Sequence, residues 1–196
     1  MSSGLKSVCV YCGSSNGAAP AYIAAAARFG EILAGAGIRL VYGGGGMGLM
    51  GACARAAHAA GGEVLGVIPE FLTSHERTID EIETLIVSNM HERKMTMFEA
   101  ADAFVVLPGA IGTLEEAVEL LSWRRLGLHA KPIVFFNPDG FWDPLFELFA
   151  SFTERRLMPP EFAMCWGAVE EIEDVLPAVR AMPAEGAVTV PIVQRA

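Results

Sequence analysis

The segment AFVVLPGAIGTLEE, residues 103–116, joins an apolar run to a glycine-containing loop and then to a polar helix start. AFVVL has the length and composition of a buried strand, and TLEE opens a helical pattern. Glycines between two such elements let backbone N–H groups approach another group closely. The segment therefore predicts a strand–loop–helix unit, the element from which α/β folds are built.

The same alternation continues along the chain. Further strand-like runs are SVCVY, IRLVY, EVLGVI, ETLIV and PIVFF, and helical patterns cover residues 20–36, 47–60, 90–101, 113–126, 142–157 and, more weakly, 170–182. Apolar strands that are buried on both faces and separated by helices are typical of a parallel sheet. We expect an α/β fold with a parallel sheet of about six or seven strands. Residues 1–182 form a single domain in this prediction, and residues 183–196 form a peripheral tail.

Charge and composition exclude several classes of partner. The formal net charge of -9 disfavours nucleic acids and anionic membranes, which bind to a positive field. No apolar run is long enough to span a bilayer, and the N-terminal segment lacks a secretory apolar region, so a cytoplasmic location is expected. The four cysteines are too scattered for a disulfide framework and are expected to be buried free thiols: Cys9, Cys12, Cys53 and Cys165.

Four unusual loops follow predicted strands. They are CGSSNG (12–17), GGGGMG (43–48), SNMHERK (88–94) and PGAIGT (108–113). In a parallel sheet such loops all emerge at the carboxyl edge, where α/β proteins bind their ligands. We expect the chemistry at the point where these four loops meet.

The second loop contains G-x-G-x-x-G at Gly46, Gly48 and Gly51, between a strand and a helix. That context suits a dinucleotide fingerprint, but the acidic residue expected after the next strand has only Glu70 as a candidate. A loop that holds a phosphate or ribose at a helix N-terminus fits equally. The remaining alternative is a turn whose glycines serve close helix–sheet packing.

The third loop leads into a helix with two cations in its first turn. Asn89 is placed to cap this helix, with Glu92 completing a capping box. Helical rotation puts Arg93 and Lys94 beside an inward arc that includes Met90. The helix dipole opposes positive charge there, so either an anionic ligand offsets it or both side chains extend to solvent. Met95 stands where a zinc-binding H-E-x-x-H motif requires histidine.

In the fourth loop, Thr113 and Glu116 have the spacing of a capping box. The same rotation turns Glu115 toward water and Glu116 toward the interior. A carboxylate near a helix N-terminus is favoured in its charged form, which suits it to face a cationic transition state. A purely structural role as a helix cap remains the alternative.

Together these motifs resemble the Lonely guy family of cytokinin riboside 5′-monophosphate phosphoribohydrolases. The resemblance runs from SVCVYCGSS to NPDGFW and includes GGGGMGLMG, MHERK and the hallmark P-G-G-x-G-T-x-x-E. It implies a Rossmann-like three-layer fold, a homodimer, and hydrolysis of the N-glycosidic bond of AMP-type nucleotides, with neither metal nor other cofactor.

The resemblance also implies roles for individual residues. The catalytic arginine and glutamate fall on Arg93 and Glu116. Positions that bind the nucleotide monophosphate fall on Gly13, Ser14, Gly43, Gly44, Gly46, Gly48, Met90, Lys94, Pro108, Gly109, Ala110, Ile111, Gly112 and Thr113. The hallmark's second glycine is Ala110 here, which is strained if the position needs a positive φ. A further substrate-contacting glutamate has Glu76 as its nearest candidate.

Three other functions stay open on the sequence. A nicotinamide-dependent oxidoreductase would use the glycine motif, and a pyridoxal-dependent decarboxylase would need a reactive lysine, for which Lys94 is the candidate nearest the site. A nucleotide-binding protein without catalysis would use the same loops. This alternative stays open because Ala110 departs from the hallmark of the family.

Overall fold

The computed structural model describes residues 4–74 and 78–183. Within these two ranges, seven parallel strands form one sheet in the order β4-β3-β2-β1-β5-β6-β7. Their bounds are β1 Ser7–Tyr11, β2 Arg39–Tyr42, β3 Val64–Pro69, β4 Glu83–Val87, β5 Ala103–Val106, β6 Ile133–Phe136 and β7 Gly167–Val169. The α/β class and the parallel sheet predicted from the sequence are confirmed.

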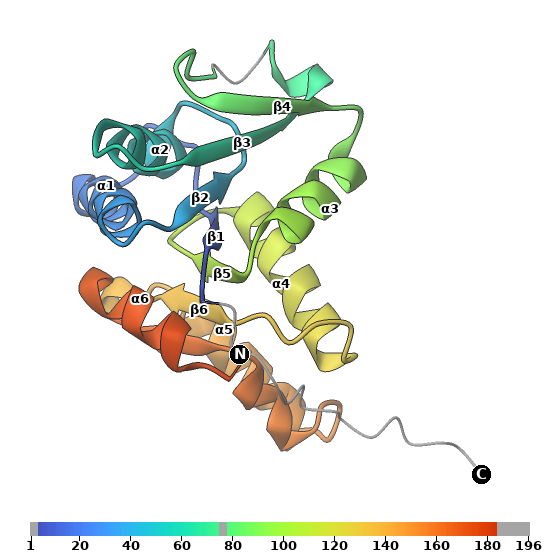
Figure 1. Ribbon diagram of the computed structural model, residues 1–196. Coiled ribbons are helices and arrows are strands. Elements are labelled where there is room, and N and C mark those ends of the chain that lie inside the picture. The colour runs from blue at the N-terminus through green and yellow to red at the C-terminus, as the bar shows by residue number, and fades with distance from the viewer. Residues whose placement is uncertain (1–3, 75–77, 184–196) are drawn as a thin grey trace.

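The described part of the chain has six α-helices, of which five lie between strands and the sixth follows β7, and together they cover both faces of the sheet. They are α1 Pro20–Gly35, α2 Gly48–Ala59, α3 Met90–Ala100, α4 Ile111–Arg125, α5 Asp143–Glu154 and α6 Ile172–Ala181. Helices α1 and α2 lie on one side of the central strands and α3 and α4 on the other, so the molecule has three layers (Figure 1).

Alternate residues of the central strands supply two cores. On β1, Val8 and Val10 join the core beneath α1, α2 and α6, whereas Cys9 and Tyr11 join the core beneath α3, α4 and α5. Successive side chains of a strand point to opposite faces, so one apolar strand serves both layers. Cys9 and Cys12 therefore lie in different cores, and all four cysteines are buried free thiols, as expected.

The structure corrects three details of the prediction. Strand β7, at Gly167–Val169, was not among the strand-like runs. Strand β4 was expected to be buried on both faces, but it is an edge strand with Leu85 and Ile86 exposed. Helix α4 begins at Ile111, two residues before the expected start, so its N-cap is Ala110 and the predicted Thr113–Glu116 capping box is wrong.

Two predictions fall outside the part of the chain that the structure describes. One is Glu76 as a further substrate contact, and the other is the tail from residue 184 onward. Within the described ranges, none of the helices has the length and apolar character needed to cross a bilayer.

Candidate active site

The loops after β1 and β5 meet where the order of the sheet reverses. Strand β1 pairs with β2 on one side and with β5 on the other, so the connections from β1 and β5 diverge at this point. The Gly13 N–H donates a hydrogen bond of 3.1 Å to the Pro108 carbonyl, which joins the two loops directly. Such a reversal at the carboxyl edge leaves a crevice in which α/β folds bind ligands.

The glycine motif of α2 packs against the β1 loop. Gly48 has a φ of +58°, and a Cβ at this position would lie 2.6 Å from the Ser14 carbonyl carbon. Its N–H donates to Asn16 Oδ1 at 2.9 Å, and the Met50 N–H donates to the Gly13 carbonyl at 3.2 Å. Two backbone N–H groups at the start of α2 thus already hydrogen-bond to the loop after β1 and are not available to a phosphate. This favours the explanation that the glycines serve close packing over a dinucleotide fingerprint.

Arg93 is fixed by the backbone of two strands. Its Nε donates to the Val67 carbonyl at 3.2 Å, and its Nη2 donates to the Gly43 carbonyl at 3.0 Å. Gly43 must be glycine for this contact, because a Cβ would lie 2.1 Å from Nη2. The remaining nitrogen, Nη1, lies 3.9 Å from Met90 Sδ and 3.9 Å from Glu116 Oε1. A guanidinium held on two sides presents its third side in one fixed direction.

The start of α3 explains how Arg93 reaches this position. Asn89 Oδ1 accepts the Glu92 N–H at 2.9 Å, which confirms the predicted cap. The Glu92 carboxylate reaches back to the N–H and hydroxyl of Ser88, at 2.7 and 2.6 Å, and not to Asn89 as a capping box would require. The helix thus starts at a defined residue, and Arg93 is turned into the protein with 6% of its surface exposed.

Glu116 faces Arg93 from α4. Because the helix starts at Ile111, Glu116 lies in its second turn, beyond the positions that cap a helix. Its side chain is 12% exposed and that of Arg93 is 7% exposed, so the pair is largely shielded from water. Charged groups interact more strongly in such surroundings than at the surface.

A cavity of about 140 Å³ opens beside this pair. Its walls come from all four loops or the helices that follow them, and the lining residues are Cys12, Gly13, Ser14, Met50, Arg93, Ala110, Gly112, Thr113 and Glu116. The first amides of α4 have no partner inside the helix and lie at its positive end, so this wall suits an anion. One cavity thus combines an anion-binding helix start, a fixed guanidinium and a carboxylate.

The thiol in this cavity is neutral at physiological pH. Burial raises the pKa of Cys12 well above its ordinary value, and electrostatic interactions with Cys53 and Glu116 add to the effect. A neutral, buried thiol is a poor nucleophile. Within residues 4–74 and 78–183, no group of three or more histidine, cysteine, aspartate or glutamate side chains could hold a metal ion.

Lys94 has other partners. Its Nζ lies 2.7 Å from Glu115 Oε1 and 2.9 Å from Glu119 Oε2, both on α4. Partial burial acts to lower the pKa of Lys94, but the hydrogen bonds to Glu115 and Glu119 outweigh it and the pKa is raised. The charge of Lys94 is therefore offset by the protein, and Lys94 is not among the described residues that line the cavity.

The structure brings together only part of the predicted site. Gly13, Ser14, Ala110, Gly112 and Thr113 line the cavity with the charged pair, while Pro108 and Gly109 line a neighbouring one. Gly43 and Met90 contact Arg93. Three further predicted glycines pack against other residues and not around the cavity: Gly44 against Ile68, Gly46 against Gly51 and Gly48 against Ser14. The side chain of Ile111 points to solvent, and the residue is 79% exposed. Sequence reasoning missed Cys12 and Met50. Met50 could have been found from its place in the first turn of α2, beside the glycine motif.

Ala110 is not strained. Its φ of -102° and ψ of -154° are extended values that any residue adopts. The condition under which alanine would be strained here, a positive φ, is therefore not met, and alanine can replace the hallmark's second glycine without distorting the loop.

Comparisons with known proteins agree with this architecture. Residues 50–179 match the family model described as "Possible lysine decarboxylase". Over 140 residues the chain is 49% identical to the cytokinin riboside 5′-monophosphate phosphoribohydrolase LOG of Oryza sativa subsp. japonica, covering 71% of this chain and 58% of that protein. Two Arabidopsis thaliana proteins with the same enzyme name are each 44% identical, over 79% and 78% of this chain and 72% and 76% of their own.

Solved structures share the fold at lower identity. The molybdenum cofactor binding protein of Rippkaea orientalis aligns with a TM-score of 0.68 at 22% identity, over 92% of this chain and 98% of that one. The molybdenum cofactor carrier protein of Chlamydomonas reinhardtii aligns with a TM-score of 0.67 at 18% identity, over 91% and 98%. At these identities the likeness shows a common Rossmann-like fold.

Proposed function

We infer the chemistry of this chain from its family, because it belongs to the Lonely guy family, which the model "Possible lysine decarboxylase" describes. We propose that it hydrolyses the N-glycosidic bond of AMP-type nucleotides, including those substituted at N6, and releases the free base and ribose 5-phosphate. The plant relatives carry the name of this activity. The observation that carries the proposal is the approach of Arg93 Nη1 to Glu116 Oε1, 3.9 Å apart beside a cavity with a helix start in its wall.

The proposed reaction develops positive charge on the sugar. As the bond from C1′ to the base breaks, its electron pair leaves with the base and the ribose becomes oxocarbenium-like. The Glu116 carboxylate stabilises this cation and orients water for addition at C1′. The hydroxyl of the water joins C1′, and its proton ends on the departing base.

The other groups hold the substrate. The amides at the start of α4 bind the 5′-phosphate, because a helix N-terminus attracts anions. Arg93 offers Nη1 to the substrate while Val67 and Gly43 hold its other nitrogens, so it enters the reaction already positioned.

The geometry of the lysines speaks against a decarboxylase that forms a Schiff base. The chain has three lysines, and such an enzyme needs one with a free, neutral amine at the site. Lys6 and Lys131 precede β1 and β6 and so lie at the opposite edge of the sheet. Lys94 is at the correct edge, but Glu115 and Glu119 hold it in its charged form.

The direct test is incubation with plain AMP and with its N6-isopentenyl form, followed by separation of free base from intact nucleotide. We expect release of the base together with an equal amount of ribose 5-phosphate. Nucleotide binding without release would select a non-catalytic binding protein. A tight complex with NAD would revive the oxidoreductase alternative.

We also propose that the chain acts in the cytoplasm as a homodimer. Buried free thiols fit a reducing compartment.

The face of α4 with Ile111, Val118 and Leu126 exposes apolar side chains that a second copy could cover. The neighbouring Arg124 does not contribute, because it is 2% exposed and donates to the carbonyls of Ala130 and Lys131. Sedimentation velocity at several concentrations tests the dimer.

A further inference from the structure

Two methionine side chains lie around the guanidinium of Arg93. Met90 is the first residue of α3 and Arg93 follows one turn later, so their side chains share one face of the helix. Arg93 Nη1 donates to Met90 Sδ at 3.9 Å, a long contact to a weak acceptor. From another direction, the side chain of Met50 lies beside Gly43, whose carbonyl accepts from Nη2. Sulfur chemistry at either methionine would therefore act on the catalytic arginine.

The nitrogen that faces Met90 is the one that the proposed function assigns to the substrate. The carbonyls of Val67 and Gly43 hold the other two nitrogens of Arg93. Met90 Sδ and Glu116 Oε1 each lie 3.9 Å from Nη1, so neither forms a short hydrogen bond with it. A stronger acceptor at the position of the sulfur would capture Nη1 and withdraw it from the substrate.

Met90 is the more accessible of these two methionines. It is half-buried, whereas Met50 is 9% exposed. The thiols of the chain are all buried, and burial raises the pKa of Cys12 and Cys53, so these groups stay neutral and react slowly. A small oxidant that reaches the site therefore meets the thioether of Met90 first.

We propose that Met90 is an oxidation site and that its sulfoxide switches the catalytic centre off, with a hydroperoxide as the oxidant. One oxygen of hydrogen peroxide passes to Sδ: the O–O bond breaks, the S=O bond forms, and the hydroxyl left behind takes the remaining proton and leaves as water. Sulfur is oxidised and the peroxide is reduced. The sulfoxide oxygen is polar and accepts Nη1 in a charge-assisted hydrogen bond. Methionine sulfoxide reductases restore the thioether, so the loss is reversible.

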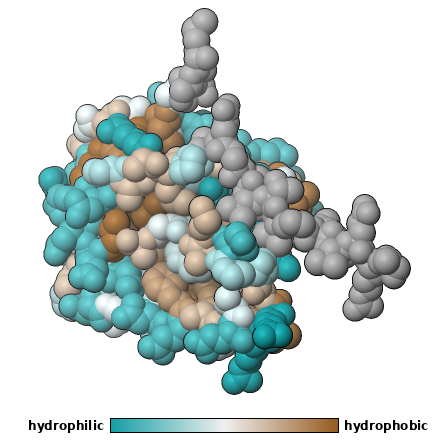
Figure 2. Space-filling model, turned by 90° about the horizontal axis from the view of Figure 1, so that it is seen from below, coloured by the Kyte–Doolittle hydropathy of each residue, from teal (hydrophilic) through white to brown (hydrophobic). Residues whose placement is uncertain are grey.

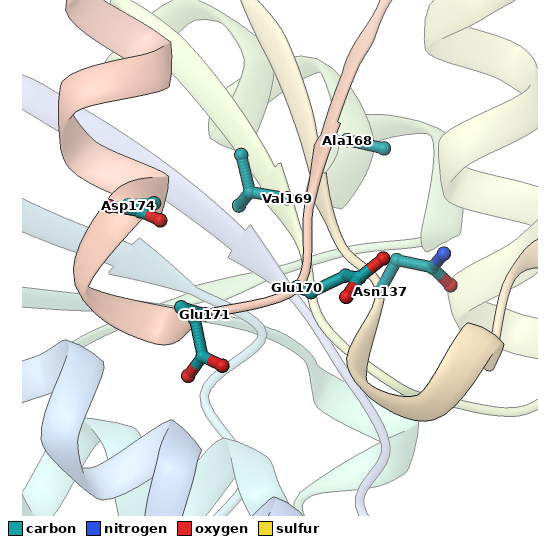
Figure 3. A pocket seen from close by; sticks show the side chains of 6 residues that line it. All are labelled: Asn137, Ala168, Val169, Glu170, Glu171 and Asp174. Atoms are coloured by element: carbon teal, nitrogen blue, oxygen red, sulfur yellow. The ribbon is translucent and has the colours of Figure 1, made fainter.

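The proposal rests on the proposed function for the role of Nη1, so its test also needs a readout that does not depend on cleavage. Binding of a nucleotide provides it. A cavity of about 420 Å³ at the start of α6 has the carboxylates of Glu170, Glu171 and Asp174 in its wall (Figure 3). Because these charges repel a phosphate, nucleotide affinity reports on the cavity beside Arg93.

Met164 provides a matched control. Exposed apolar groups also occur away from the site: seen from below, apolar residues lie among hydrophilic ones on the face that α5 and α6 form (Figure 2). Met164 is 65% exposed, and its segment, Pro160–Cys165, precedes β7 and so lies at the edge of the sheet opposite the cavity. Its oxidation is expected to leave Arg93 unaffected.

The experiment treats the wild type, Met90→Leu, Met50→Leu and Met164→Leu with hydrogen peroxide, which catalase then removes. Leucine keeps the size and apolar character of methionine. We measure kcat/KM for N6-isopentenyl-AMP and, by calorimetry, the dissociation constant of a C-nucleoside analogue of AMP, whose base is joined through carbon and cannot be released. Each value is compared with that of the same variant before treatment. Peptide mass spectrometry gives the fraction of each methionine that is oxidised.

The treated wild type is expected to lose about 10-fold or more in kcat/KM and in affinity for the analogue, in proportion to the sulfoxide at Met90, because one hydrogen bond to a charged group is withdrawn. Both values recover with the two methionine sulfoxide reductases and a thiol, but not with the thiol alone. Met90→Leu keeps its untreated values, whereas Met50→Leu and Met164→Leu lose as much as the wild type.

A loss that persists in Met90→Leu, or that follows the oxidation of Met50, overturns the proposal. So does a Met90 that stays reduced when Met164 is fully oxidised. The correlation in the wild type needs no variant, so it decides even if Met90→Leu does not fold. If the wild type never releases the base but its affinity for the analogue follows the sulfoxide at Met90, the proposed function fails and the oxidation site stands.

Discussion

The Arg93 guanidinium and the Glu116 carboxylate, carried by helices α3 and α4, lie 3.9 Å apart between Nη1 and Oε1 and are 7% and 12% exposed. Arg93 is additionally held by two backbone carbonyls, so the pair is fixed before any substrate arrives. Groups that are preorganised in this way contribute most when charge develops in a transition state. The first two predictions follow from this relationship.

Replacing Glu116 by glutamine removes the negative charge and keeps the size of the side chain. We expect turnover of N6-isopentenyl-AMP to fall at least ~100-fold with an unchanged fold, because loss of one electrostatic or acid–base group typically costs that much. The control is Glu115→Gln on the same helix, which is half exposed and leaves Glu119 to hold Lys94. Near-normal turnover in Glu116→Gln would leave that residue without a chemical role.

Truncating Arg93 to alanine should reduce both activity and stability. The change removes the hydrogen bonds that Arg93 donates to the carbonyls of Val67 and Gly43 and the positive charge that faces Glu116, so we expect the free energy of unfolding to fall by about 3 kcal/mol. Arg55→Ala is the comparison, because Arg55 also donates to a carbonyl, that of Gly46, but from an exposed position. Urea unfolding of both variants decides: a loss in Arg93→Ala no larger than in Arg55→Ala would contradict the prediction.

Ala110→Gly tests whether the hallmark glycine matters for the loop. The backbone at Ala110 is extended, so glycine gains nothing in the folded state and adds freedom to the unfolded chain. We expect a loss of about 0.4–1 kcal/mol in stability and kcat/KM for AMP within roughly 3-fold of wild type. A gain in kcat/KM of tenfold or more would show that the methyl group obstructs the reaction.

Gly48→Ala should disturb the site from a distance. The residue has a φ of +58°, and its Cβ would lie 2.6 Å from the Ser14 carbonyl carbon and 2.8 Å from the Ser15 nitrogen. We expect a loss of at least about 2 kcal/mol, since the left-handed backbone alone costs about 1–2 kcal/mol. Gly35→Ala is the control: nothing lies within 4 Å of its Cβ, and alanine there should stabilise helix α1. Equal stability of the two variants would argue against the close packing of α2 on the β1 loop.

The sequence predicts the elements with strong apolar patterns and misses those without one. Six of the seven strands in the described part of the chain follow from their apolar runs, whereas β7 is three residues long, half exposed and followed by two glutamates. The predicted start of α4 is displaced because Thr113 and Glu116 have the spacing of a capping box, although the helix begins at Ile111, with Ala110 as an N-cap that makes no side-chain hydrogen bond.

The sequence likewise predicts some features of the candidate site and misses others. Helical rotation turns Arg93 and Glu116 inward, and the structure places them face to face. The partners of Lys94 depend on how α3 packs beside α4, which no local pattern encodes. Tyr22 and Phe141 meet across more than a hundred residues of sequence, so the cavity that they line is recognised only in the fold.

The buried thiols should make the protein less stable in alkali. Burial raises the pKa of Cys53 from its ordinary value of 9.0 to about 12. Below pH 9 the thiol is neutral in both states; above it, the unfolded chain releases a proton that the folded protein keeps, so stability falls as pH rises. We expect the slope of unfolding free energy between pH 9 and 11 to be shallower in Cys53→Ala, by roughly 1 kcal/mol per pH unit. Val8→Ala, a truncation in the same core, should lower stability equally at every pH, and a parallel curve for Cys53→Ala would refute this account.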